Sequence, residues 1–349
     1  MRVLHLATDV YGGHGGIALY NRDFVAALAK HPCIEEIVVL PRLIHSEPEP
    51  FPPKVRFLAG AAHSKIAYGA MLTKMLVRER PFDLVVCAHV NLLPYTVFTR
   101  RAPLLMVYGI EAWQPHWMPP RLRAVAAISE LTLERFRSWA HPEAPAFLLP
   151  NAIDLSLYGI RPKSDALLDR YGLRGRRVLL TVGRVVAEER YKGFDEVIEV
   201  LRELPEDIAY LIAGGGSDID RLRAKALSCG VADRVVFTGL FDECDKPALY
   251  NLADVYVMPS RGEGFGFVLL EALASGVPVI GSRHDGGREA LRNGDLGILV
   301  DPASGAELRA AILELLARNE RHIPDGLAYF AVDQFDTRVH AMVDALEPR

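Results

Sequence analysis

The amino-acid sequence predicts an α/β protein of two domains, each built on a doubly wound parallel sheet. The first indication is the length of 349 residues, which exceeds the roughly 100–200 residues that one domain usually holds. The second is a repeated alternation of short β-rich runs with helix-like segments, which is typical of parallel sheets covered by helices on both faces. The third is that this alternation restarts after Pro150-Asn151-Ala152-Ile153-Asp154, which indicates a second domain.

The predicted elements follow in chain order. In the first domain, strands are expected at residues 3–8, 37–40, 84–87, 104–108 and 124–128, and helices at 17–30 and 65–80. In the second domain, strands are expected at residues 178–182, 209–213, 235–238, 255–258 and 277–281, separated by helices. The domains therefore span residues 1–155 and 156–332. Residues 333–349 carry apolar side chains at helical spacing and form a helix that could pack back on the first domain, although the sequence leaves open which domain it covers.

Composition and charge exclude several classes of protein. A net charge of -4 is too close to balance for a dedicated nucleic-acid binder. The four cysteines form no CxxC pair and are expected to be reduced thiols. No apolar run approaches the 18 residues that a membrane-spanning helix needs, and the N-terminus turns polar within its first residues, unlike a secretory signal. We therefore expect a cytoplasmic protein, with a basic first half and an acidic second half.

Two glycine-rich turns are candidates for ligand contact, because ligands of open parallel sheets bind beyond the carboxyl ends of the strands. The first turn, residues 9–16, ends with Gly15 and Gly16 and could bring backbone N–H groups close to a phosphate or sugar. This turn also fits a dinucleotide-binding pattern. That pattern requires an acidic residue at the end of the second strand, but the second strand here ends in Leu40-Pro41-Arg42, so a nicotinamide cofactor is disfavoured. A turn that only packs helix on strand is the plain alternative. The second turn, residues 213–217, ends another strand and could border the site formed by Arg184 and Lys192 in the second domain.

Two cations flank one helix N-terminus in the second domain. Arg184 follows Gly183 at the end of a strand, and Lys192 precedes a helix that begins near residue 194. A guanidinium, an ammonium and a helix dipole together suit a diphosphate, whose developing negative charge they could stabilise. A solvated basic loop is the alternative, and Glu188, Glu189 and Arg190 are expected to be surface charges.

Two glutamates eight positions apart carry the most specific signal. Glu263 lies in a glycine-spaced turn, Gly-Glu-Gly-Phe-Gly, and Glu271 lies about one turn into the helix that follows. Carboxylates accept hydrogen bonds from vicinal hydroxyls, so one could hold a ribose and the other a pyranose. The N–H groups of Gly266, Phe267 and Val268 at the helix start could receive phosphate. This pattern fits a nucleotide sugar.

Together, these motifs resemble the retaining family 4 glycosyltransferases of the GT-B fold, and the likeness covers nearly the whole chain. The resemblance implies two Rossmann-like domains facing a central cleft. It implies that Glu271 binds the ribose, that Glu263 contacts the donor sugar near its reacting end, and that Arg184 and Lys192 neutralise the leaving diphosphate, which makes Glu263, Arg184 and Lys192 the catalytic residues. The donor-binding residues that it implies are Gly15, Gly16, Gly183, Arg184, Lys192, Leu240, Glu263, Phe265, Gly266, Phe267, Val268 and Glu271.

The resemblance implies transfer of a sugar from a UDP- or GDP-linked donor to a hydroxyl of a glycan, glycolipid or lipid-linked acceptor, with retention of anomeric configuration. It implies no metal and no cofactor beyond the donor substrate. Leu240 would cup the nucleobase through its backbone. Tyr108 stands where many relatives carry a histidine, and is a possible contact of the donor sugar in its place.

Residues 64–80 combine lysines and arginines with an apolar set, Ile66, Met71, Leu72, Met75 and Leu76. This basic amphipathic pattern predicts either a surface helix packed on the sheet or a face that rests on an anionic membrane.

Two other functions remain open at this stage. A non-catalytic nucleotide-sugar-binding subunit would usually have lost one of the four charged site residues, and all are present. A glycosidase would use Glu263 and Glu271 as its carboxylate pair but has no use for the cations. The donor nucleotide and sugar, the acceptor, the linkage and the oligomeric state cannot be read from the sequence.

Overall fold

A computed structural model of the chain describes residues 1–347. It divides into two compact units: unit 1 holds residues 1–152 together with helix α11 (Val332–Leu346), and unit 2 holds residues 153–331. Each unit contains one sheet, and every strand pair in both sheets is parallel. The predicted fold class, two doubly wound α/β units, is confirmed.

Unit 1 has a seven-stranded sheet in the order β3-β2-β1-β4-β5-β6-β7. Its strands are β1 (Arg2–Ala7), β2 (Glu36–Pro41), β3 (Val55–Phe57), β4 (Leu84–Ala88), β5 (Leu104–Val107), β6 (Ala124–Ala127) and β7 (Ala146–Leu148). The main helices beside α11 are α1 (Gly16–Lys30), α2 (Lys65–Arg78) and α3 (Glu130–Ala140). Strands β1 and β4 are buried over their whole length, because helices cover both faces of the sheet.

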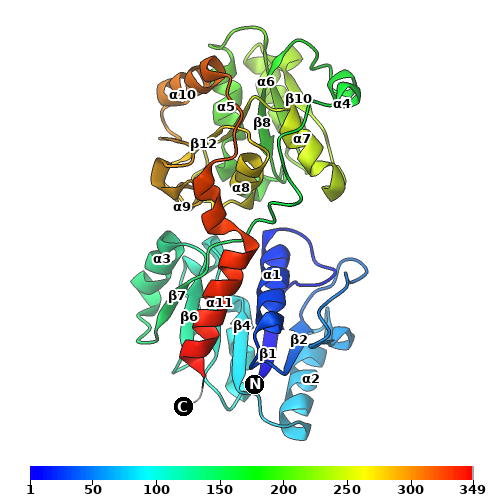
Figure 1. Cartoon of the computed structure of the whole chain (residues 1–349), viewed down its shortest axis with the longest axis vertical. Coiled ribbons are helices and arrows are strands. Elements are labelled where there is room, and N and C mark those ends of the chain that lie inside the picture. Colours follow the sequence, from blue (N-terminus) through cyan, green and yellow to red (C-terminus); the bar gives the residue numbers. More distant parts are fainter. Residues whose placement is uncertain (348–349) are drawn as a thin grey trace. The chain divides into compact units, whose positions relative to one another are not determined.

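The C-terminal helix α11 packs against α1, and the two run side by side in Figure 1. The rings of Tyr20 and Phe335 meet edge to face at 5.5 Å, and His340 Nε2 lies 3.0 Å from the carbonyl oxygen of Ala27. The helix therefore covers unit 1. The sequence had left open which of the two domains it would cover.

Unit 2 has a six-stranded sheet in the order β10-β9-β8-β11-β12-β13. Its strands are β8 (Arg177–Val182), β9 (Ile208–Ala213), β10 (Val235–Phe237), β11 (Val255–Met258), β12 (Val279–Ser282) and β13 (Ile298–Val300). Its helices are α4 (Asp165–Arg170), α5 (Phe194–Leu201), α6 (Ile219–Ser228), α7 (Lys246–Leu252), α8 (Phe267–Ala274), α9 (Gly287–Ala290) and α10 (Gly305–Arg318).

The strand order reverses between β1 and β4 in unit 1 and between β8 and β11 in unit 2. At such a switch point the connections leave in opposite directions and open a crevice beyond the carboxyl ends of the two strands. In unit 2 the loops that meet there are those after β8 and β11. These loops carry Arg184 and Glu263.

Candidate active site

Two glycines place Lys192 beside the end of β8. A Cβ atom on Gly183 would lie 3.3 Å from Lys192 Cδ, so the glycine makes room for the lysine stem. Gly193 precedes α5 with a φ of +87°, and a Cβ atom there would lie 2.6 Å from the carbonyl oxygen of Pro259. The Lys192–Gly193 pair therefore brings the loop after β8 against the loop after β11.

Lys192 lies between two carboxylates. Its Nζ is 3.5 Å from Glu263 Oε2 and 3.5 Å from Glu189 Oε2, and Arg184 pairs with the other oxygen of Glu189. Burial favours the neutral amine, but the charges of Glu263 and Glu189 outweigh it and raise the pKa of Lys192. Lys192 is therefore a cation at neutral pH.

Glu189 is buried, with 9% of its side chain exposed. Its expected place among the surface charges is wrong, because it is the counter-ion of both site cations. The cluster thus contains two positive and two negative groups: Arg184 and Lys192 against Glu189 and Glu263.

Glu263 has an unused acceptor at this point. Its Oε2 is buried and accepts no hydrogen bond from any residue within the described part of the chain. Buried polar atoms are usually hydrogen-bonded, so an oxygen that has only an ion-pair contact with Lys192 is suited to accept a ligand hydroxyl.

Glu271 lies on α8 with 3% of the residue exposed. Tyr250 donates from its hydroxyl to Glu271 Oε2 at 2.6 Å, and Lys246 Nζ donates to Oε1 at 3.0 Å. Neither partner was predicted from the sequence. Their spacing of four residues, which puts both side chains on one face of α7, is the signal that could have found them.

The start of α8 is open to an anion. Gly266 is the N-cap residue with a φ of +93°, and no side chain caps the helix. The first N–H groups of a helix lack intrahelical partners, so Phe267 and Val268 can offer theirs to a ligand. Phe265 differs, because its side chain is buried and packs on Phe330 at 5.5 Å between ring centroids, which leaves only its backbone for a ligand.

Leu240 and the glycines after β9 adjoin the same loops. Leu240 is 89% exposed, and a Cβ atom on Gly215 would lie 2.7 Å from its side chain. A Cβ atom on Gly214 would lie 1.9 Å from the carbonyl oxygen of Gly183. The turn after β9 therefore does border the cation site, and an exposed leucine forms an apolar surface beside it.

The predicted residues of unit 1 lie at the ends of β1 and β5. Gly15 is the N-cap of α1 with a φ of +84°, and Gly16 begins that helix. Tyr108 is buried, and its hydroxyl donates to Asn21 Oδ1 at 2.9 Å, next to His5 Nε2, which lies 3.1 Å from the same oxygen. The phenol thus has a partner inside unit 1, and its contact with a donor sugar stays a prediction.

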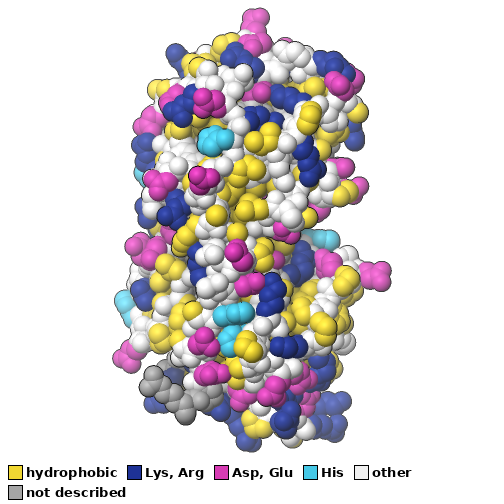
Figure 2. Space-filling view, in the orientation of Figure 1, with side chains coloured by type: hydrophobic (Ala, Val, Ile, Leu, Met, Phe, Trp, Pro, Cys, Tyr) yellow, Lys and Arg dark blue, Asp and Glu magenta, His cyan; other side chains and the backbone are white. Residues whose placement is uncertain are grey.

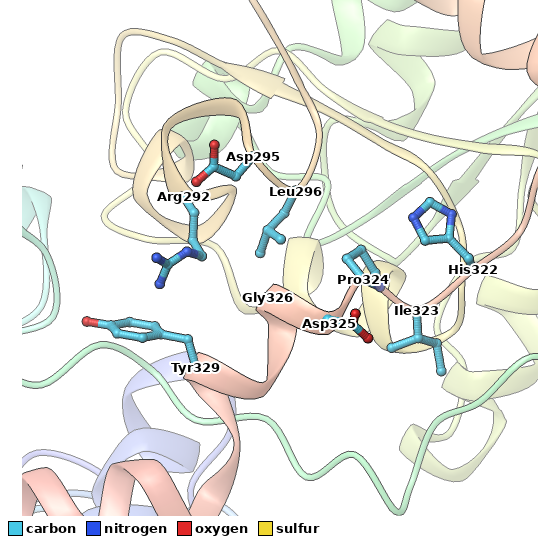
Figure 3. A pocket seen from close by; sticks show the side chains of 9 residues that line it. All are labelled: Arg292, Asp295, Leu296, His322, Ile323, Pro324, Asp325, Gly326 and Tyr329. Atoms are coloured by element: carbon cyan, nitrogen blue, oxygen red, sulfur yellow. The ribbon is translucent and has the colours of Figure 1, made fainter.

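An open hollow of about 660 Å³ lies elsewhere in unit 2, between residues 292–296 and 322–329 (Figure 3). The guanidinium of Arg292 lies over the ring of Tyr329, 4.6 Å from its centroid. No predicted site residue lines this hollow.

The chain matches known proteins along most of its length. The family model described as glycosyl transferases group 1 matches residues 167–323. A GDP-mannose-dependent alpha-(1-6)-phosphatidylinositol monomannoside mannosyltransferase of Mycolicibacterium smegmatis is 35% identical over 240 residues, which are 64% of this chain and 62% of that protein. A lipopolysaccharide core biosynthesis mannosyltransferase of Rhizobium leguminosarum bv. viciae is 27% identical, over 70% of this chain and 72% of that protein. The chain thus spans less than two thirds of the length of the mycobacterial relative.

Among solved structures, the crystal structure of Anabaena HepE in complex with UDP and glucose is similar with a TM-score of 0.79. It covers 99% of this chain and 100% of that one, at 19% sequence identity. At 19% sequence identity, the similarity supports the fold alone.

Proposed function

We propose that this chain is a glycosyltransferase that uses a nucleoside diphosphate sugar, because residues 167–323 match the model of glycosyl transferases group 1 and the fold is that of GT-B proteins. The observation that carries the proposal is the position of Lys192, 3.5 Å from Glu263 and beside Arg184 at the switch point of unit 2. Two cations, a carboxylate oxygen that accepts no hydrogen bond and an uncapped helix start meet at the ends of neighbouring strands. That combination suits a sugar joined to a diphosphate.

In the proposed reaction, Arg184 and Lys192 stabilise the negative charge that grows on the diphosphate as the bond from the sugar C1 to its phosphate oxygen breaks. A hydroxyl oxygen of the acceptor forms the new bond on the same face, and its proton goes to the departing diphosphate, so that the anomeric configuration is retained. Glu263 would accept a hydroxyl of the sugar through Oε2, and Glu271 would accept from the ribose. The two site cations supply the charge that a metal ion supplies in other transferases.

Glu189 is the counter-ion of the two site cations before the donor binds. In the free protein its carboxylate neutralises Arg184 and Lys192. A diphosphate must therefore compete with Glu189 for both cations, which would limit how tightly the nucleotide product is held. Gly15, Gly16 and Tyr108 remain proposed donor contacts from unit 1.

For the donor and the acceptor, the relatives named above support GDP-mannose as the first donor to test and a phosphatidylinositol glycolipid or lipopolysaccharide core as the acceptor class. A thermal-shift screen with GDP, UDP, ADP and their sugar conjugates in the presence of EDTA tests the donor site. A ligand that binds only the folded state raises the melting temperature, so one nucleoside diphosphate series should do so selectively and NADP should not. Stabilisation by NADP alone would refute the assignment of the Arg184 and Lys192 site.

We also propose that unit 1 docks on an anionic membrane, at its cytosolic face, through helix α2. Leu72 and Met75, two members of the apolar set seen in the sequence, are buried in the core together with Tyr68. The outward face instead carries Ile66 and Val77, which are 85% and 78% exposed. Exposed lysines and arginines flank them: Lys65, Lys74, Arg78 and Arg80. Figure 2 shows Lys and Arg side chains gathered over this part of unit 1.

Reversing two charges on α2 should release the protein from anionic vesicles. Each basic side chain near such a surface contributes about 1 kcal/mol, so Lys74→Glu with Arg78→Glu should weaken binding at least tenfold. Vesicle flotation with and without anionic lipid measures this, and Arg223→Glu on the exposed face of α6 is the matched control. Equal binding of both variants, or binding that ignores lipid charge and salt, would contradict the surface assignment. No helix among residues 1–347 is long and apolar enough to cross a bilayer.

A further inference from the structure

Asp285, in the loop after β12, is a fully buried carboxylate that the proposed reaction does not use. Its Oδ2 accepts from the hydroxyl of Ser260 at 2.5 Å and from the N–H of Glu263 at 3.0 Å, while Oδ1 accepts from the N–H of Gly287 at 3.0 Å. Three donors therefore converge on one side chain, and two of them come from the loop after β11.

The same two loops also meet through their backbones. Gly286 donates its N–H to the carbonyl oxygen of Glu263 at 2.8 Å, and a Cβ atom on Gly286 would lie 1.9 Å from the carbonyl oxygen of Gly264. The peptide groups of Glu263 are thus held on the N–H side by Asp285 and on the C=O side by Gly286. This double contact fixes the residue whose carboxylate lies 3.5 Å from Lys192.

A carboxylate is required for this arrangement. Asparagine has one acceptor oxygen, so its NH2 group would face at least one of the three donors that Asp285 now satisfies. An ionised carboxylate is also costly to bury, and burial together with the charge of Glu263 raises the pKa of Asp285 to about 6 although its three donors oppose the shift. A buried carboxylate with a shifted pKa, such as Asp285, next to a proposed site residue, such as Glu263, is typical of a functional site.

We propose that Asp285 is a positioning residue of the transfer reaction: through Ser260 and the N–H of Glu263 it holds the loop after β11 so that Glu263 stays beside Lys192. Asp285 does not itself touch the donor, so its removal should spare the binding of the nucleoside diphosphate and slow the step that needs Glu263. This inference rests on the proposed function of Glu263.

A double-mutant cycle on the full chain tests the inference, with kcat for donor turnover, the Kd for the nucleoside diphosphate and the melting temperature measured for each variant. Asp285→Asn should lower kcat 10- to 100-fold and leave Kd within threefold. Added to Glu263→Gln it should lower kcat no further, because the group that it positions is already altered. Ser260→Ala, which removes one donor and keeps the carboxylate, should cause a smaller loss of kcat, and Asp295→Asn on the exposed surface should cause none.

Losses of kcat that multiply in the double variant, or losses that follow the folded fraction, would overturn the positioning role and leave Asp285 with a structural one. If Asp285→Asn does not fold, the same cycle with Ser260→Ala decides. Absence of turnover by the wild-type protein with every donor would count against the proposed function instead, so the two failures are distinguishable.

Discussion

Replacing Lys192 with alanine should lower kcat for sugar transfer about 10²- to 10³-fold, the usual cost of removing one group that stabilises developing negative charge. The lysine is the buried cation of the site and lies 3.5 Å from both Glu189 and Glu263. Folding should suffer far less. Arg184 remains to pair with Glu189, and Glu263 is partly exposed, so we expect the unfolding free energy to fall by no more than about 2 kcal/mol.

Lys225→Ala is the matched control for this prediction. Lys225 lies on α6 of the same unit and pairs with the exposed Glu199, so its loss should change neither kcat nor the melting temperature measurably. Steady-state turnover is measured per folded molecule, with the folded fraction taken from thermal melts. If Lys192→Ala keeps its turnover per folded molecule, the lysine is a structural cation and not a catalytic one.

Replacing Glu271 with glutamine should weaken the binding of a ribonucleoside diphosphate about 10- to 100-fold, because hydrogen bonds to a charged group contribute about 1.5–3 kcal/mol. The carboxylate is already oriented by Tyr250 and Lys246. The wild-type protein should therefore prefer the ribonucleotide over its 2′,3′-dideoxy analogue, and the variant should lose that preference. Isothermal titration calorimetry with both nucleotides measures it.

Glu243→Gln provides the control for Glu271. Glu243 is the other carboxylate of Lys246, at 3.1 Å, but its side chain is 83% exposed. Its replacement should leave the preference for ribose intact. Equal loss of affinity for the ribonucleotide and the dideoxy analogue in Glu271→Gln would show that Glu271 supports the site without contacting the ribose.

The fold could be predicted from the sequence, because strands buried on both faces are near-continuous apolar runs. The glycine-spaced turns are distinctive enough to indicate a resemblance to a known family. The resemblance to family 4 glycosyltransferases is supported by the match of residues 167–323 to the model of glycosyl transferases group 1. The similarity to solved structures supports the two-domain fold. Strands β3, β7 and β13, each of three residues, were not predicted, whereas β10, which is equally short, was. They lie toward the edges of the sheets, where burial is incomplete.

The charges of the site were only partly predictable. In the sequence, Glu189 is one of several charged residues in a polar loop. Only the fold shows that its side chain is buried and pairs with Arg184 and Lys192. Asp285 belongs to a loop distant in sequence from Glu263, and its role depends on pairing of β11 with β12. The hydroxyl of Tyr108 is directed at Asn21, a contact across 87 residues that no local pattern contains. Such pairings depend on strand order, which the sequence does not state.

Proton NMR of a nucleoside diphosphate sugar and a hydroxyl acceptor with the protein, in the presence of EDTA, tests the proposed sugar transfer. GDP-mannose with a phosphatidylinositol glycolipid is the first pair to try, followed by the UDP-linked sugars. We expect release of the nucleoside diphosphate and a first-formed glycoside with the anomeric configuration of the donor, both abolished by Lys192→Ala. An inverted anomer, or turnover that Lys192→Ala leaves unchanged, would contradict the proposed transfer.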